Sequence, residues 1–298
     1  MNINRCIVVF IKGEEMTNKL SKYFRQPALY IKLPTGGKFN PELDQTVLDE
    51  VGILPMTAVD EITMKNPDAL LNGEALLSVI KSCVPAVRDA KKLCNIDAEA
   101  IYYAIQYATY GNEITHTHTC SKCEEKSEFN IDINYVLNRF PDIEILEPVE
   151  WQDVKIHIQP PTVESMTRLA LIELEQRKLV KTVKDSVLEY ETTEGAEQEV
   201  AQRFYKSFRK IAEHNVNLLA NTIRYVETPD EIVEDYESIS EFLDNIPTKI
   251  VDIINENVKK VAVKPTDISK FEFVCPECEQ KDTVDLEVNP VNFFVSGS

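Results

Sequence analysis

The chain has 298 residues, of which 43% are hydrophobic and 28% charged, as in ordinary globular proteins. Its net charge of −18 repels phosphate backbones and anionic lipid surfaces, which argues against broad nucleic-acid binding and against membrane-surface binding. No run of 18 apolar residues predicts a transmembrane helix, and the eight glycines form neither a P-loop nor a dinucleotide-binding fingerprint. The length fits two domains, or one domain with an elaborate insertion.

Residues 1–27 are predicted to be an N-terminal extension. The apolar stretch at residues 6–11 is too short for the core of a signal peptide and has no cleavage site after it. Residues 12–15 (KGEE) stand directly before Met16, and codons for Lys-Gly-Glu can spell a bacterial ribosome-binding site. We therefore expect translation to start at Met16, in a cytoplasm that keeps cysteines reduced.

A β-hairpin is predicted to open an N-terminal α+β region at residues 28–111. Leu29, Ile31 and Leu33 alternate with polar or half-polar neighbours, which is typical of a strand with one buried face. Residues 34–37 (PTGG) follow directly and predict a tight turn.

Helices are predicted after this hairpin. Thr57 and Asp60 have the spacing of a capping box. Apolar residues at near-helical spacing then precede Cys83: Leu70, Leu71, Leu76, Leu77 and Ile80. Asp97 is expected to cap the next helix, which should end at Gly111. Like Cys94, Cys83 is predicted to be a buried small hydrophobic residue.

Two Cys-x-x-Cys turns are the strongest motif of the chain. Cys120 and Cys123 form the first pair, and Cys275 and Cys278 form the second. Each pair is followed by a lysine and then by a segment of alternating apolar and polar residues, which predicts a hairpin with two thiols in its turn. Together the pairs supply four thiolates, the ligand set of a structural zinc ribbon.

Between positions 123 and 275 lie 151 residues, so one shared metal would close a very long loop. We predict a split zinc ribbon at residues 112–160 and 262–298, with a helical insertion at residues 161–261. Within the insertion, a long amphipathic helix is predicted after residue 200, a capping box at Ser238, and another apolar helix face after Ile250.

Other interpretations of the cysteines are redox dithiols, disulfides and an iron site. A redox Cys-x-x-Cys normally opens a helix, whereas strands are predicted to follow both pairs here. Disulfides fit poorly because the chain has seven cysteines and no secretion signal. The sequence leaves iron open. His116 and His118 precede Cys120 and could replace a thiolate, but four cysteines already saturate a tetrahedral metal, so we expect a polar strand or loop there.

Catalytic motifs are absent from the sequence. There is no His-Glu-x-x-His and no serine in a His and Asp context, and only four histidines (His116, His118, His157 and His214) are available for acid–base chemistry. We therefore predict that the chain is not an enzyme. Two other classes stay open: a zinc-ribbon module that binds nucleic acid or regulates, and, less favoured, a zinc enzyme.

The order of elements resembles that of the baseplate hub subunits and hub assembly proteins of T4-like contractile-tailed bacteriophages. The resemblance covers residues 28–294 and is carried by the following segments: Leu33–Gly37, Leu54–Thr57 with Asp60-Glu61, Ala104–Gly111 running into the first cysteine pair, Ser238–Pro247, and the second cysteine pair followed by Phe293-Phe294. The resemblance implies a structural or assembly role without catalytic residues. It also implies other baseplate or tail hub proteins as partners, with the tape-measure protein as a further candidate. The implied locations are the host cytoplasm during assembly and the virion tail baseplate.

Overall fold

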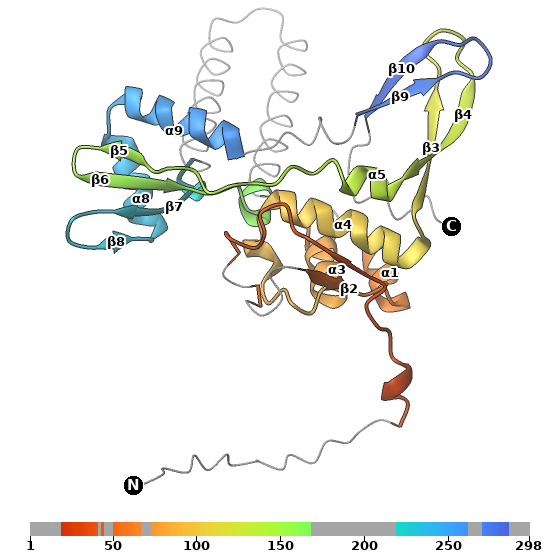
Figure 1. Ribbon diagram of the computed structural model, residues 1–298, viewed down its shortest axis with the longest axis horizontal. Coiled ribbons are helices and arrows are strands. Elements are labelled where there is room, and N and C mark those ends of the chain that lie inside the picture. Colours follow the sequence, from red (N-terminus) through yellow and green to blue (C-terminus); the bar gives the residue numbers. More distant parts are fainter. Residues whose placement is uncertain are drawn as a thin grey trace, which may run out of the picture.

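The computed structural model describes residues 19–40, 43–44, 50–66, 69, 73–167, 219–261 and 270–285. These residues form a mixed α and β architecture with three parts (Figure 1). A body of helices and one strand pair lies in the middle. A four-stranded sheet with two helices lies at one end, and two cysteine-bearing hairpins lie at the other. None of the described helices is long and apolar enough to cross a membrane.

The N-terminal body contains one antiparallel strand pair and several helices. In chain order these are η1 (Ser21–Tyr23), β1 (Leu29–Ile31), β2 (Val51–Ile53), α1 (Ala58–Met64), α3 (Glu74–Cys83), η3 (Ala90–Lys92) and α4 (Asn95–Tyr110). Helix α4 is the centre of this part, because ten of its residues are buried. Its apolar side chains pack with those of the strand pair and α3 in one cluster, which holds Val51, Ile53, Val79, Ile80, Ile101 and Ile105.

Several predictions for the body are confirmed. Thr57 and Asp60 form the capping box of α1. Gly111 ends α4 at a φ of 99°, in the left-handed region that favours glycine. Cys83 and Cys94 are buried. Asp60 also accepts a hydrogen bond from Ser82 and lies 3.3 Å from Arg25, so the cap ties α1 to α3 and to the incoming chain.

The predicted β-hairpin has a different turn from the expected one. Strand β1 pairs with β2, and residues 34–37 do not join two paired strands. They form a turn in which Gly36 and Gly37 have φ angles of 59° and 72°, and this turn lies against α4. The sequence predicted the turn at residues 34–37 but not its packing against α4. The strand that pairs with β1 is the short β2, which follows only after a long connection.

Asp97 does not cap α4, because the helix already begins at Asn95. Its carboxylate is fully buried and accepts hydrogen bonds from the backbone N–H of Thr35 at 2.9 Å, from the hydroxyl of the same residue, and from the Asn40 amide. Burial raises the pKa of Asp97, while these hydrogen bonds oppose the rise. The capping prediction is therefore wrong, and Asp97 instead anchors the turn to α4.

We expect the buried carboxyl of Glu99 to make the stability of the N-terminal body depend on pH. Burial raises the pKa of its carboxyl to about 7, against an ordinary value of 4.5, although Asn95 donates a hydrogen bond to it at 2.7 Å. Between these two pKa values the folded state binds more protons than the unfolded state, so stability falls as pH rises through this window. From pH 5 to pH 8 we expect a loss on the order of 3 kcal/mol from this group.

Glu99→Gln should abolish that loss in urea unfolding followed at pH 5, 6, 7 and 8. The exposed Glu256→Gln is the matched control for removing one carboxylate. Equal slopes of unfolding free energy against pH in the two variants would contradict the assignment.

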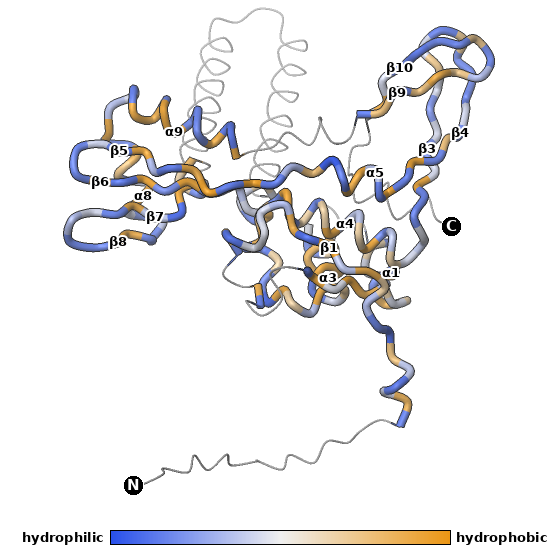
Figure 2. The backbone as a smooth tube through the Cα atoms, viewed as in Figure 1, coloured by the Kyte–Doolittle hydropathy of each residue, from blue (hydrophilic) through white to orange (hydrophobic). Residues whose placement is uncertain are grey.

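The four-stranded sheet is antiparallel throughout and has the order β5-β6-β7-β8. Its strands and the two helices that follow them are β5 (Val149–Trp151), β6 (Val154–Ile158), β7 (Ile223–Glu227), β8 (Ile232–Val233), α8 (Tyr236–Asn245) and α9 (Thr248–Val261). One apolar cluster joins sheet and helices, and its members include Ile156, Ile223, Val226, Leu243 and Ile254. The turn between β5 and β6 is hydrophilic, as are the tips of the cysteine hairpins (Figure 2).

Residues 161–261 are not purely helical, so that prediction is wrong for β7 and β8. The segment predicted as ribbon, residues 112–160, includes β5 and β6, which pair with each other, but β6 also pairs with β7, so the boundary at 160/161 cuts through a sheet. The pairing of β6 with β7 joins residues far apart in the sequence, and no local pattern specifies such a partner.

The N-terminal cap of helix α8 is Asp235, whose carboxylate accepts a hydrogen bond from the Ser238 backbone N–H at 2.8 Å. Met16, the long helix predicted from Val200 to Leu219, apart from its last residue, and the Phe293-Phe294 tail lie outside the described residues. Leu219 itself is helical and buried.

Both cysteine segments form the predicted hairpins. The first consists of β3 (Glu113–Thr119) and β4 (Lys126–Asp132), followed by the short helix α5 (Ile133–Leu137). The second consists of β9 (Lys270–Val274) and β10 (Lys281–Asp285). The two hairpins lie side by side with their tips together (Figure 1).

Candidate metal centre

The backbones of the two cysteine turns have the same conformation. In the first, the Cys120 N–H donates to the Glu125 carbonyl at 2.9 Å, and the Glu124 N–H donates to the Cys120 carbonyl at 3.0 Å. In the second turn, the equivalent bonds from Cys275 and Glu279 have the same lengths. The residue after each pair has a positive φ, 61° at Glu124 and 57° at Glu279. Each turn is thus a knuckle that presents two thiols from one side of a hairpin tip.

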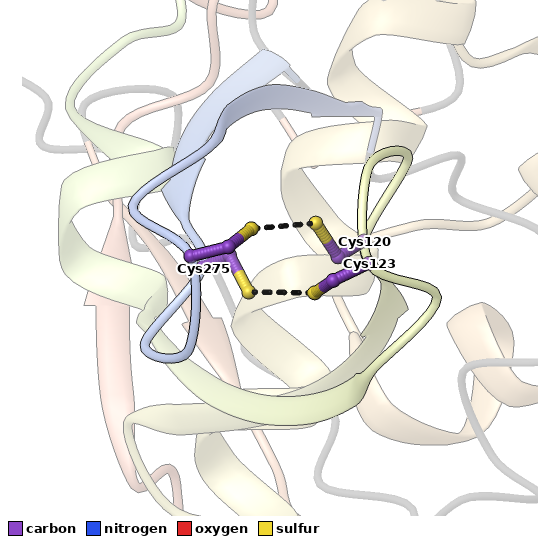
Figure 3. Close-up of side chains that lie close together, drawn as sticks. Cys120, Cys123 and Cys275 are labelled. Atoms are coloured by element: carbon purple, nitrogen blue, oxygen red, sulfur yellow. Dashed lines mark hydrogen bonds between the residues drawn. The ribbon is translucent and has the colours of Figure 1, made fainter.

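The four thiols of the two knuckles converge on one point (Figure 3). All four sulfur atoms lie within 4.8 Å of one another. The Sγ atoms of Cys120 and Cys278 are 3.6 Å apart, as are those of Cys123 and Cys275. A tetrahedral zinc with bonds of about 2.3 Å places its sulfurs roughly 3.8 Å apart. The donor set and its spacing therefore fit one four-thiolate metal.

Neighbouring sulfurs influence the ionisation of one another. Backbone hydrogen bonds from Cys123 and Lys122 lower the pKa of Cys120 to about 7. A backbone hydrogen bond at Glu125 acts in the same direction on Cys123, but contacts with the other three sulfurs and desolvation raise its pKa to about 12. Several adjacent thiolates repel one another unless a cation lies between them.

A centre with these ligands is chemically closed. Four thiolates complete a tetrahedral coordination shell and leave no position for water or substrate, so such a metal holds the fold and does not activate a reactant. The six cysteines in the described part of the chain are free thiols, and neither pair opens a helix, unlike a redox motif.

His118 lies beside the cluster and contacts an aspartate. It is on β3, and its Nε2 atom is 2.9 Å from the Asp282 carboxylate on β10. The same carboxylate accepts from the Ser121 backbone N–H at 3.0 Å and from its hydroxyl at 2.6 Å. These hydrogen bonds from Ser121 and His118 hold the pKa of Asp282 well below its usual range.

Sequence reasoning missed Asp282 and Ser121, although both join the hairpins. Acidic and hydroxyl residues are common in exposed turns, so neither stands out on its own. His116 points to a different neighbour and packs edge-on against Phe129 at a ring distance of 5.5 Å. The expectation of a polar strand at His116 and His118 agrees with their place on β3.

A second contact joins the base of β9 to α5. The Arg139 guanidinium donates to the Lys270 carbonyl at 2.9 Å and lies over the rings of Tyr135 and Phe271, at 5.5 Å and 5.4 Å from their centroids. Cation–π contacts of this kind contribute modestly at exposed sites. The second hairpin is therefore held at its base as well as at its tip.

Comparisons with known proteins give one match. A model of the family described as T4 bacteriophage base plate protein matches residues 28–295. No curated protein and no solved structure matches significantly. The matched residues include both cysteine hairpins, the four-stranded sheet and the N-terminal body from β1 onward. Because the match covers most of its length, the chain belongs to the family of T4 bacteriophage base plate proteins.

Proposed function

We propose that this chain is a structural or assembly protein of the hub of a phage tail baseplate. In this role it binds other baseplate or tail hub proteins through its surface, and a closed four-thiolate metal holds its two hairpins together. The observation that carries the proposal is the family match over residues 28–295. The geometry of the four cysteines supports a structural metal, and zinc is the metal that best suits a closed four-sulfur site.

Exposed apolar side chains support a role in protein–protein contacts. On α1, Val59 and Ile62 are 71% and 69% exposed and lie one helical turn apart. Tyr23 on the incoming chain is 73% exposed. Of these side chains, Val59 and Ile62 are neighbours on one helix face, and contiguous exposed apolar side chains of this kind commonly mark surfaces that other proteins cover. Partner proteins of the baseplate, including the tape-measure protein, are candidates to cover them.

The other classes of function receive less support. A nucleic-acid module needs a basic surface, and the net charge of −18 opposes one. A zinc enzyme needs an open coordination position, and four thiolates leave none. We therefore propose a non-enzymatic protein that functions in the host cytoplasm during assembly and in the virion tail.

Quantitative mass spectrometry of purified phage particles and of tail assembly intermediates tests this proposal. Peptides at a fixed low copy number per finished particle, relative to the tail tube protein, are the expected result for a baseplate component. Peptides present with intermediates and absent from particles would make the chain a transient assembly factor. Absence from both tail fractions would contradict the proposal.

A further inference from the structure

The two knuckles are related by an approximate twofold rotation through the sulfur cluster. Cys120 is equivalent to Cys275, and Cys123 is equivalent to Cys278, as their matching backbone hydrogen bonds show. The rotation exchanges the contact between Cys120 and Cys278 with the contact between Cys123 and Cys275, and both measure 3.6 Å. The equivalent residues Cys120 and Cys275 are also both buried.

The same twofold rotation relates residues of the strands next to the two knuckles. His118 pairs across its hairpin with Ser127, and Phe273 pairs across its hairpin with Asp282. His118 and Phe273 are equivalent, and their rings meet edge to face with centroids 5.0 Å apart. Ser127 and Asp282 are therefore also equivalent positions that differ in chemistry.

The polar contact between the hairpins breaks the symmetry. Asp282 accepts from the Ser121 N–H and hydroxyl and contacts His118, and its side chain is only 10% exposed. The residue equivalent to Ser121 is Pro276, which has no N–H to donate. Ser127 has no carboxylate to accept such a bond. The hydrogen bonds between the hairpins therefore form once only: Ser121 of the first knuckle donates to Asp282 of the second hairpin, and the equivalent pair, Pro276 and Ser127, lacks both the donor and the carboxylate.

We propose that Asp282 is the positioning residue that docks the second knuckle onto the first in the correct register for metal binding. This inference rests on the proposed metal site. The carboxylate holds the backbone of Ser121, the residue directly after the ligand Cys120, so it fixes the first knuckle relative to the second. Groups that orient metal ligands in this way commonly contribute about 10- to 100-fold to metal affinity.

Replacing Asp282 by the residue at its equivalent position tests the inference. Asp282→Ser in the full chain should raise the dissociation constant for Co²⁺, measured by competition with a chelator, by about tenfold or more. The visible spectrum at saturation should keep its four-thiolate form, because all four ligands remain. Glu272→Ser removes an exposed carboxylate from the same hairpin and is the matched control, expected to bind as wild type.

A relocation of the contact separates positioning from a loss of stability. The double variant Asp282→Ser with Ser127→Asp places the carboxylate opposite Pro276, where no N–H is available, and should stay weak. Adding Pro276→Ser supplies the missing N–H and hydroxyl by symmetry, and this triple variant should recover most of the lost affinity.

Each outcome decides one claim. If wild type does not bind one Co²⁺ per chain with a thiolate spectrum, the proposed metal site fails. If wild type does bind it, and Asp282→Ser binds as tightly as Glu272→Ser, the metal site stands and the positioning role of Asp282 is overturned. A triple variant no tighter than the double variant would overturn the directional contact.

Discussion

Cys275→Ser should release the metal and detach the second hairpin from the first. A serine hydroxyl is not ionised at neutral pH and is a poor zinc ligand, so three thiolates would remain in a site built for four. Structural zinc contributes on the order of 10 kcal/mol of apparent binding free energy, and the hairpin pair should lose most of that amount.

The loss should be local to the hairpins. Apart from the cysteines, their shared apolar cluster consists mainly of Phe129, Phe273 and Val284, and a two-stranded hairpin alone is marginal in water. The two larger apolar clusters lie in the N-terminal body, where Ile114 and Ile131 from the base of the first hairpin also pack, and in the four-stranded sheet. We therefore expect fast amide exchange in residues 115–130 and 270–285 of the variant, with exchange at the base of the first hairpin, in α4 and in the sheet unchanged.

The control for this variant is Glu277→Ser, an exposed position between the two cysteines of the same knuckle. It should keep one metal per chain and wild-type exchange. If Cys275→Ser retained stoichiometric metal and slow exchange at both hairpins, the four cysteines would not form one site.

Asp97→Ala should destabilise the N-terminal body by about 3–5 kcal/mol, because it leaves buried donors without an acceptor. The backbone N–H and the hydroxyl of Thr35 and the amide of Asn40 all donate to this one carboxylate. Asn40 in turn accepts from the Cys94 N–H at 2.9 Å, next to the start of α4. The turn at residues 34–37 should therefore separate from the helix.

Hydrogen exchange of peptides from residues 28–111, followed against denaturant concentration, measures this effect. Asp97→Asn retains one acceptor oxygen and should fall between the alanine variant and wild type. The exposed Asp244→Ala on α8 is the control and should change stability by less than about 0.5 kcal/mol. An alanine variant at position 97 within 1 kcal/mol of wild type would contradict the anchoring role.

Local patterns predicted much of the fold. The capping box at Thr57, the end of α4 at Gly111 and the hairpins around the two cysteine pairs all follow from short-range physics, and all are present. The four cysteines were identifiable because thiolates at this spacing have few other uses in a reduced chain. The convergence of their sulfurs is the structural feature that the motif predicted best.

Strand pairings between residues far apart in the chain could not be predicted from the sequence. The pairing of β6 with β7 spans the insertion, and alternation in each strand shows one buried face but not the partner that covers it. The role of Asp97 was missed for the same reason, since an aspartate near a helix start usually caps it. Only the position of Thr35 in space shows that Asp97 serves the turn.

X-ray absorption at the metal edge of the purified chain, together with elemental analysis, reports directly on the four-cysteine site. We expect one metal per chain surrounded by four sulfur atoms, at about 2.3 Å if the metal is zinc. A first shell containing nitrogen or oxygen, or a chain that carries no stoichiometric metal and whose cysteines are joined as disulfides, would contradict it.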